Sequence, residues 1–262
     1  MLLQVKNLEI IYGKNSPIVE DVSFDLQPGE ILAIVGESGS GKTSIIRAIQ
    51  NCLPANGLVS KGELVFKDKN LLQLTNREKL DLCGTEISMI FQDSGNMLNP
   101  IKTIGEQFLA YLKTHGFTDK KEAYNKAVEM IEMVRLANPQ NILKSYVFEL
   151  SGGMRQRVGI AMAMALNPCL LLADEPTSAL DVTMQAQIIK EMLNLRDRLN
   201  VAIIIVTHNL GVASFMADKI LIMKDGQAIE QGRAKDVILQ PSSDYTKLLL
   251  AAVPRLGGHS FG

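Results

Sequence analysis

Cysteine is scarce in this 262-residue sequence, and this scarcity bears on the compartment in which the protein works. The three cysteines, Cys52, Cys83 and Cys169, are scattered along the chain and form no C-x-x-C pair. An odd number of separated thiols does not predict a disulfide framework and is typical of a reducing compartment. We therefore expect these thiols to be buried structural residues.

The sequence also lacks an excess of either charge and any long apolar run. Its 27 Lys and Arg residues are balanced by 28 Asp and Glu residues, which leaves a formal net charge of −1. Without a basic surplus we expect no nucleic acid as the main partner. No apolar run approaches the roughly 18 residues of a spanning helix, and the N-terminal MLLQVKNLEI has no basic region followed by a long apolar one. The sequence predicts neither a transmembrane segment nor a signal peptide.

No internal repeat, low-complexity segment or long linker is present. With 47% hydrophobic and 21% charged residues, the composition is that of an ordinary globular protein. We expect one domain that carries a subdomain.

What the sequence does contain is a phosphate-binding pattern at residues 31–49, ILAIVGESGSGKTSIIRAI. An apolar run, a glycine loop and a helical run follow one another and match G-x-x-x-x-G-K-S/T. Glycines let backbone N–H groups converge on phosphate oxygens, and the helix N-terminus adds partial positive charge. We expect Lys42 to reach the β- and γ-phosphates and Thr43 to hold Mg²⁺. The predicted contacts to ATP in this loop are Gly36, Glu37, Ser38, Gly39, Ser40, Gly41, Lys42, Thr43 and Ser44.

Two segments before this loop, 2–10 and 18–26, alternate apolar with polar residues, as half-buried antiparallel strands do. Tyr12 is placed in the loop between them, where a tyrosine can stack on a base; the alternative is a surface or strand-edge tyrosine. Near the other end of the chain, residues 219–232 predict a hairpin that turns at Asp225-Gly226.

Three short apolar runs end in polar side chains, as buried strands that lead to an active-site edge do. Successive side chains on a strand point in opposite directions, so Asp174 and Glu175 cannot share one role unless their strand ends between them. Polar loop residues and a structural histidine are the alternatives. The runs and their polar residues are 86–93 with Gln92, 169–176 with Asp174 and Glu175, and 201–208 with His208.

The remaining segments predict helices. From Asn99 to Asn167 no strand pattern is convincing, and Ser151-Gly152-Gly153 begins a helix that offers a second anion-binding terminus. Residues 62–74 read as a strand and a short helix. The apolar positions expected to be buried on one helical run are Ala123, Ala127, Met130, Ile131 and Val134, and a helix over 182–199 is expected to turn Met184, Ile188, Met192 and Leu199 toward the sheet.

Taken together, these motifs resemble the ATP-binding subunit of an ABC transporter over nearly the whole chain and in the expected order. The resemblance implies an α/β P-loop NTPase with a mixed, mainly parallel sheet, an N-terminal antiparallel β subdomain and an inserted helical subdomain. It divides the chain into a nucleotide-binding core (1–92 and 168–240), a helical signature subdomain (93–167) and a C-terminal tail (241–262). The matching motifs are the phosphate loop at 36–43, the Q-loop Gln92, LSGGMRQ at 150–156, the Walker B residues Asp174 and Glu175, SALD at 178–181 and the switch His208.

The same resemblance implies the role of each residue. Tyr12 would stack on adenine, Glu175 would be the general base and His208 would contact the γ-phosphate. Asp181 would lie at a dimer interface. The residues implied for Mg²⁺ are Thr43, Gln92 and Asp174, and those implied for ATP on a partner subunit are Ser151, Gly152, Gly153 and Gln156.

Within the family, FQDSGNMLNP, PTSALDVTMQAQII and QPSSDYTKLLLAAVP resemble the ATPases of bacterial peptide and nickel importers. Ser94 replaces the proline usual after FQD, and SDYT at 243–246 replaces HPYT. Many peptide-importing relatives continue into a cysteine-rich extension, whereas no cysteine follows Cys169. We therefore expect no iron–sulfur cluster, and the short chain favours the nickel or metal-chelate members.

The expected protein is an ATP-hydrolysing subunit, peripheral on the cytoplasmic face of the bacterial inner membrane. Its implied partners are two membrane permease subunits, a second ATPase subunit that is more often a related chain than an identical one, and indirectly an extracytoplasmic solute-binding protein. A soluble ABC-type ATPase acting on DNA or ribosomes is the alternative, but it would show two phosphate loops or a long coiled coil. A small-molecule P-loop kinase would not explain LSGGMRQ or SALD.

Overall fold

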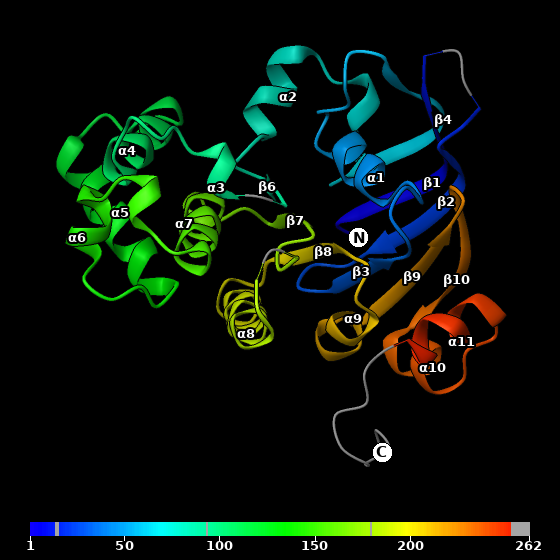
Figure 1. Cartoon of the computed structure of the whole chain (residues 1–262). Helices are drawn as coiled ribbons and strands as arrows, with labels where there is room; N and C mark the ends of the chain where they lie inside the picture. Colours follow the sequence, from blue (N-terminus) through cyan, green and yellow to red (C-terminus); the bar gives the residue numbers. More distant parts are fainter. Residues whose placement is uncertain (14–15, 93, 179, 253–262) are drawn as a thin grey trace.

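The computed structural model describes residues 1–252 apart from 14, 15, 93 and 179, and it consists of two β-sheets with helices around them (Figure 1). The α/β class with a mixed sheet, an antiparallel N-terminal sheet and an inserted group of helices is confirmed. Ala179 of the SALD motif and residues 253–262 of the predicted tail lie outside the described residues. None of the helices in the described part of the chain has the length and apolar content needed to span a bilayer.

The smaller sheet is antiparallel, in the order β2-β1-β4-β5. Its first strand places alternate side chains in the core, and an irregularity between Val5 and Leu8, with Asn7 at φ 45°, returns Leu8 to the buried face. Tyr12 is the last residue of β1 and is not in a loop, because β1 continues to pair with β4 as far as Gly57. The strands are β1 (Leu3–Tyr12), β2 (Val19–Leu26), β4 (Gly57–Phe66) and β5 (Lys69–Asn70).

The larger sheet has the order β10-β9-β3-β8-β7-β6, in which only β10 runs antiparallel to its neighbour. The predicted hairpin at Asp225-Gly226 is confirmed. The predicted strand ending on Gln92 is two residues shorter, because β6 stops at Ile90. The strands are β3 (Ile31–Val35), β6 (Ile87–Ile90), β7 (Leu170–Asp174), β8 (Ala202–Thr207), β9 (Lys219–Lys224) and β10 (Gln227–Arg233).

Helices cover both faces of the larger sheet, and α4 to α7 form a group to one side of it (Figure 1). The second part of the predicted strand and helix at 62–74 is instead β5 and a 3₁₀ turn, η1 (Leu71–Gln73). A second 3₁₀ turn, η2 (Val147–Glu149), precedes α7. The helices are α1 (Lys42–Ile49), α2 (Asn76–Leu82), α3 (Ser94–Met97), α4 (Ile104–Thr114), α5 (Lys120–Met133), α6 (Pro139–Lys144), α7 (Gly152–Met164), α8 (Val182–Leu199), α9 (Leu210–Met216), α10 (Ala234–Leu239) and α11 (Asp244–Ala251).

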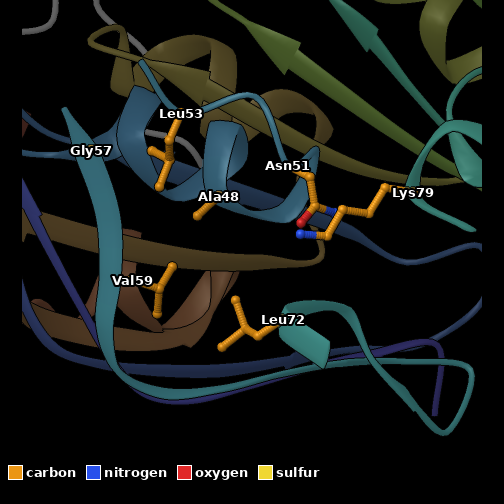
Figure 2. A pocket seen from close by; sticks show the side chains of 7 residues that line it. All are labelled: Ala48, Asn51, Leu53, Gly57, Val59, Leu72 and Lys79. Atoms are coloured by element: carbon orange, nitrogen blue, oxygen red, sulfur yellow. The ribbon is translucent and has the colours of Figure 1, made fainter. Parts of the chain in front are cut away.

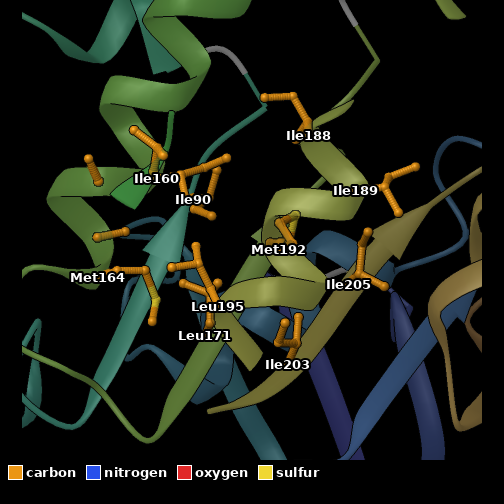
Figure 3. Packing of buried hydrophobic residues seen from close by; sticks show 14 of the residues in the cluster. Ile90, Ile160, Met164, Leu171, Ile188, Ile189, Met192, Leu195, Ile203 and Ile205 are labelled. Atoms are coloured by element: carbon orange, nitrogen blue, oxygen red, sulfur yellow. The ribbon is translucent and has the colours of Figure 1, made fainter. Parts of the chain in front are cut away.

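The parallel strands are buried on both faces because successive side chains enter different cores. Leu171 and Ile203 pack against α8 through Met192 and its neighbours (Figure 3). Leu172 and Ile204, one residue further along, pack on the other face with α1 and the smaller sheet. Each fully buried aliphatic side chain contributes about 1.5–3 kcal/mol, so this double layer fixes the ends of the strands.

Two expectations about buried residues need correction. In α8, Ile188 and Met192 face the sheet as predicted and Leu199 packs half-buried against the same core, but Met184 covers Gly153 of α7. None of the cysteines is fully buried: Cys52 is exposed, Cys83 is half-buried at the end of α2, and Cys169 is half-buried against the core just before β7. Burial still raises the pKa of the Cys169 thiol to about 11. The expected apolar face of α5 is confirmed throughout.

The carboxyl ends of β3, β6, β7 and β8 lie at one edge of the sheet because these strands are parallel neighbours. In an open α/β sheet this edge is where ligands bind. Each of these strands is followed, within two residues, by one of the polar or glycine motifs that the sequence singled out.

Candidate functional site

The phosphate loop is closely packed at two of its glycines. A Cβ on Gly36 would lie 2.1 Å from the Met223 carbonyl oxygen, and a Cβ on Gly41 would lie 2.6 Å from the Ile18 carbonyl oxygen. Gly41 also has φ 93°, a left-handed conformation that favours glycine. The backbone of the loop therefore passes between β9 and the entrance to β2 in a way that only glycine permits.

Helix α1 begins at Lys42 with no side chain capping its N-terminus and no acidic residue in its first turn. Its first N–H groups and the positive end of its dipole thus remain available to an anion. The Lys42 side chain is 4% exposed and folds back over the loop, where Nζ donates to the Glu37 carbonyl oxygen at 2.6 Å and to Ser40 Oγ at 3.3 Å. Burial lowers the pKa of Lys42, and the nearby Glu175 and Asp174 carboxylates oppose that shift.

Thr43 and Asp174 meet although 131 positions separate them: Thr43 Oγ1 donates to Asp174 Oδ1 at 2.8 Å. Asp174 ends β7 and is 5% exposed, and burial raises the pKa of its carboxyl. A buried carboxylate with one hydroxyl donor retains lone pairs without partners, and hydroxyl and carboxylate oxygens are ligands that Mg²⁺ prefers. The residues at this position therefore fit a magnesium ion.

The Glu175 carboxylate lies close to two other predicted side chains, those of Gln92 and His208. It has φ 43°, an uncommon backbone conformation for a residue with a side chain, at the point where β7 has ended. Its Oε2 lies 3.2 Å from His208 Nδ1 and 3.5 Å from Gln92 Nε2. Gln92, Glu175 and His208, which follow three adjacent strands, thus lie together.

His208 is 58% exposed and is held by its neighbours in the chain. It follows β8 directly, and the next residue, Asn209, caps α9 by accepting hydrogen bonds from Gly211 N at 2.9 Å and Val212 N at 3.3 Å. The backbone N–H of Asn209 in turn donates to Thr207 Oγ1 at 3.0 Å. The turn between strand and helix is therefore fixed, which directs the imidazole toward Glu175.

Tyr12 joins the smaller sheet to α1. Its hydroxyl lies 3.0 Å from the Ser44 hydroxyl, within hydrogen-bond distance. Its ring packs on Gly57, where a Cβ would lie 2.4 Å from Tyr12 Cε1. The ring is half-buried beside the start of α1, and stacking on a base stays a prediction.

The signature residues start α7. Ser151 Oγ accepts from Met154 N at 3.3 Å and so caps the helix, while Gly153 is covered by Met184, whose Cε lies 2.0 Å from a Cβ built on Gly153. Asp181 caps α8 in the same way, with Oδ1 accepting from Met184 N at 3.0 Å. Among the described residues no hydrogen bond joins Ser151, Gly152 or Gly153 to the phosphate loop.

Gln156 is 6% exposed, and within the described part of the chain its Nε2 has no hydrogen-bond partner. It borders a cavity of about 90 Å³ between the signature helix and the Q-loop. The lining residues are Gln92, Gly95, Gly152, Arg155, Gln156, Pro176 and Leu180. Two groups of predicted residues, the Q-loop glutamine and the signature, therefore share one small polar space.

A larger cavity, of about 330 Å³, lies behind α1 between β4, η1 and α2 (Figure 2). None of its lining residues belongs to the predicted site, so cavity size does not identify the site in this chain. The residues that line it are Ala48, Asn51, Leu53, Gly57, Val59, Leu72 and Lys79.

Two contacts that support the site could not be predicted from the sequence. Tyr245 in α11 reaches the backbone of Glu37 in the phosphate loop. Arg157, which follows the signature on α7, forms a buried ion pair with Glu191 of α8 at 3.1 Å. The SDYT segment contains Tyr245, but nothing in the sequence indicates its partner, and no sequence signal pairs Arg157 with Glu191.

A sequence model of the family described as ABC transporter matches residues 19–178. The chain is 44% identical to the oligopeptide transport ATP-binding protein OppD of Bacillus subtilis, over 97% of this chain and 72% of that protein. It is 42% identical to a probable peptide ABC transporter ATP-binding protein, y4tR, of Sinorhizobium fredii, over 97% of this chain and 77% of that protein.

Solved structures agree with these relatives. The dimeric structure of MJ0796, a bacterial ABC transporter cassette, has a TM-score of 0.78 and 26% identity, and it covers 89% of this chain and 99% of that one. The structure of cbiO1 from Clostridium perfringens, at 24% identity with a TM-score of 0.80 and 91% of each chain covered, shares the fold. This chain belongs to the ABC transporter family and is an ABC-type ATPase.

Proposed function

We propose that this chain is the MgATP-hydrolysing subunit of a bacterial importer of peptides. One observation carries the catalytic part: the hydrogen bond between Thr43 and Asp174 places the phosphate loop beside Glu175, which lies within 3.5 Å of Gln92 and His208. A loop for phosphates, an oxygen site for a cation and a carboxylate base are the parts that phosphoryl transfer to water needs.

The names of the relatives support peptides as the solute. Besides OppD and y4tR, the chain is 43% identical to the dipeptide transport ATP-binding protein DppD of Bacillus subtilis, over 97% of this chain and 77% of that protein. The preference for nickel or a metal chelate that the short chain suggested has no such support. We therefore propose di- or oligopeptides as the solute. We also expect no iron–sulfur cluster, because the sequence has three scattered cysteines and such clusters are usually held by four.

The residues divide the chemistry between them. Lys42 would exchange its contacts with Glu37 and Ser40 for the β- and γ-phosphates, and Tyr12 would stack on the base. Glu175 would accept a proton from the attacking water, while His208 would hold the γ-phosphate. Mg²⁺, held by Thr43, Asp174 and Gln92, would neutralise charge on the phosphates when bound.

A second ATPase subunit would complete the site. The capped start of α7 offers an anion site at Ser151 and Gly152, yet no hydrogen bond among the described residues links it to the phosphate loop of its own chain. We propose that it binds ATP held by the partner, together with Gly153 and Gln156, and that Asp181 lies at the same interface. A related chain is the favoured partner.

Exposed apolar side chains provide a surface for membrane subunits. Ile101 is 80% exposed and Phe148 is 70% exposed, and Tyr146 stacks on Phe148 with ring centroids 5.5 Å apart. The two segments lie together because Thr103 pairs with Tyr146 in an isolated bridge. Exposed apolar patches mark interaction sites, and we propose that one of two permease subunits docks here, on the cytoplasmic face of the inner membrane. An extracytoplasmic solute-binding protein would be an indirect partner.

We propose that the chain consists of a nucleotide-binding core (1–92 and 168–240), a helical signature subdomain (93–167) and a tail (241–262). The core would bind ATP, and the helical subdomain would carry both the signature and the docking surface.

Two measurements test the function. Calorimetry with MgAMP-PNP should show tight binding to the wild-type chain and none to Lys42→Ala; equal affinities would remove the phosphate-loop assignment. Cells that lack the gene should lose uptake of labelled di- and oligopeptides and retain uptake of Ni²⁺. Loss of Ni²⁺ uptake alone would replace peptide with metal as the solute, and absence of co-purifying membrane subunits would contradict a transport role.

A further inference from the structure

We infer that Tyr245 is a positioning residue for the phosphate loop, through which the C-terminal helix α11 becomes part of the nucleotide site. The inference rests on the proposed binding of MgATP at residues 36–44. Its starting observation is that the Tyr245 hydroxyl oxygen accepts a hydrogen bond from the backbone N–H of Glu37 at 3.3 Å. Glu37 is the second residue of the loop and follows the closely packed Gly36.

Tyr245 is held in place from three sides. The carboxylate of Glu230 in β10 accepts hydrogen bonds from Ser242 N at 2.8 Å and from Ser243 N at 3.1 Å, which fixes the chain just before α11. Ser243 Oγ then accepts from Tyr245 N at 3.2 Å and caps the helix. The next residue, Thr246, is fully buried. The helix start is therefore rigidly attached to the larger sheet.

The ring of Tyr245 contacts β9, the strand against which the phosphate loop packs. Lys224 Nζ lies 5.0 Å from the ring centroid, in range for a cation–π contact. Lys224 ends β9, and the residue before it, Met223, has the carbonyl oxygen against which Gly36 packs. β9, α11 and the first two residues of the loop thus form one connected cluster.

This cluster acts on binding through pre-organisation. A loop whose N–H groups must converge on phosphates loses conformational freedom when the nucleotide binds, and a contact that orders the loop beforehand reduces that cost. The Glu37 N–H bond fixes the corner at which the chain leaves β3 and enters the loop. Because coupling between sites is reciprocal, bound nucleotide should also hold α11 more firmly.

The test compares Tyr245→Phe, which removes only the hydroxyl, with wild type and with Tyr124→Phe, a half-buried tyrosine on α5 that serves as the matched control. Calorimetry with MgAMP-PNP should give a dissociation constant about three- to fivefold higher for Tyr245→Phe and unchanged for Tyr124→Phe. That range, about 0.7–1 kcal/mol at 1.4 kcal/mol per tenfold, is expected for one net hydrogen bond.

Kinetics and hydrogen exchange separate positioning from a purely structural role. In the complex assembled with its partner subunits, Tyr245→Phe should raise KM for MgATP by the same factor and leave kcat unchanged, as the loss of uniform binding does. MgAMP-PNP should slow amide exchange in α11 of the wild type and do so less in Tyr245→Phe.

Less than a threefold change in affinity, a fall in kcat without a change in KM, or equal protection of α11 in both proteins would overturn the inference. Lys42→Ala keeps this outcome distinct from failure of the proposed function. If Lys42→Ala loses binding while Tyr245→Phe does not, only the role of Tyr245 is wrong. If Lys42→Ala binds as wild type does, the phosphate site itself is wrong.

Discussion

Asp174 and Glu175 both reach the candidate site, because β7 ends at Asp174 and Glu175 has a left-handed backbone conformation with φ 43°. Their contacts differ: Asp174 accepts a hydrogen bond from the Thr43 hydroxyl, and the Glu175 carboxylate lies 3.2 Å from His208 Nδ1. The strand alternation that would have separated the two carboxylates is thus interrupted between them.

Because of this arrangement, Glu175→Gln tests directly whether Glu175 is the general base for ATP hydrolysis. Glutamine keeps the length and shape of the side chain but cannot accept a proton at neutral pH. We expect hydrolysis to fall by about 10²–10⁴-fold while MgATP affinity stays within twofold, measured by phosphate release from the assembled complex and by calorimetry. Hydrolysis at the wild-type rate would exclude Glu175 as the base.

The same variant should trap the pair of ATPase subunits. Without hydrolysis MgATP stays bound between the chains, so gel filtration with the partner chain should show a stable dimer for Glu175→Gln. Adding Gly152→Asp should prevent that dimer by placing negative charge at the start of α7. Gly152 suits this test because a Cβ there meets nothing nearer than 3.8 Å, whereas one on Gly153 would strike Met184.

Gly152→Ala is the matched control for the dimer experiment, since it adds the same Cβ without charge. It should still dimerise in the Glu175→Gln background. If Gly152→Asp also dimerises as well as Glu175→Gln alone, the signature helix is not an interface element.

Asp174→Asn should stabilise the protein in EDTA without nucleotide and abolish hydrolysis. Burial raises the pKa of Asp174 in the folded state, so its contribution to stability is present at low pH and is lost as pH rises through that pKa. Asparagine keeps an acceptor for Thr43 and carries no charge, so Tm should rise at pH 7–8 and the gain should shrink on acidification. In a chain of this size 1 kcal/mol shifts Tm by about 2–4 °C.

The exposed Asp181 provides the control for this measurement, because Asp181→Asn retains a residue that can cap α8. It should leave Tm close to the wild-type value. A lower Tm for Asp174→Asn at pH 8 would show that the carboxylate is already compensated in the absence of a cation.

The ion pair between Arg157 and Glu191 should stabilise the contact between α7 and α8. Their side chains are 13% and 5% exposed, and Arg157 Nη2 also donates to Gln187 Oε1 at 2.8 Å. Arg157→Met leaves the Glu191 carboxylate buried without its cation and should cost about 3–5 kcal/mol in urea unfolding. The double variant Arg157→Met/Glu191→Met should lose less than Arg157→Met alone; additive losses would mean that the two charges are not coupled.

Two substitutions of Tyr12 distinguish stacking of its ring from hydrogen bonding by its hydroxyl. Tyr12→Ala should weaken ATP and GTP alike, by about 1–3 kcal/mol if the ring stacks on the base. Because its hydroxyl lies 3.0 Å from Ser44 Oγ within the protein, Tyr12→Phe should lower the free energy of unfolding by about 0.5–1.5 kcal/mol. It should leave the affinities for both nucleotides almost unchanged. Calorimetry that finds a loss for ATP only would indicate base-specific contacts in place of stacking.

Local sequence was sufficient for the elements that carry the chemistry. The pattern around Gly36 and Lys42 predicted a strand, loop and helix, since glycine spacing and a switch from a buried run to a helical one are local signals. The apolar runs before Asp174 and His208 predicted parallel strands, and parallel strands must place their carboxyl ends at one edge. That Gln92, Glu175 and His208 belong to one site was implied by the resemblance to the ABC family, because the adjacency of their strands is not a local signal.

Local sequence was insufficient where a contact depends on distant parts of the chain. The sequence predicted a loop at Tyr12, and this was wrong because pairing with β4 extends β1 to that residue. That pairing joins segments far apart in sequence. The exposed position of Cys52 and the partial exposure of Met184 likewise depend on which neighbours cover them.

The sequence by itself determined the family, through the resemblance of its motifs taken in order, and the residues of the phosphate loop, because these depend on short patterns and fixed spacings. Only the tertiary structure decided that Tyr245 supports Glu37 across 208 positions and that Arg157 meets Glu191 inside the protein. Such contacts form when two elements dock, and their partners are chosen by the packing of the sheet and its helices, which no local pattern encodes.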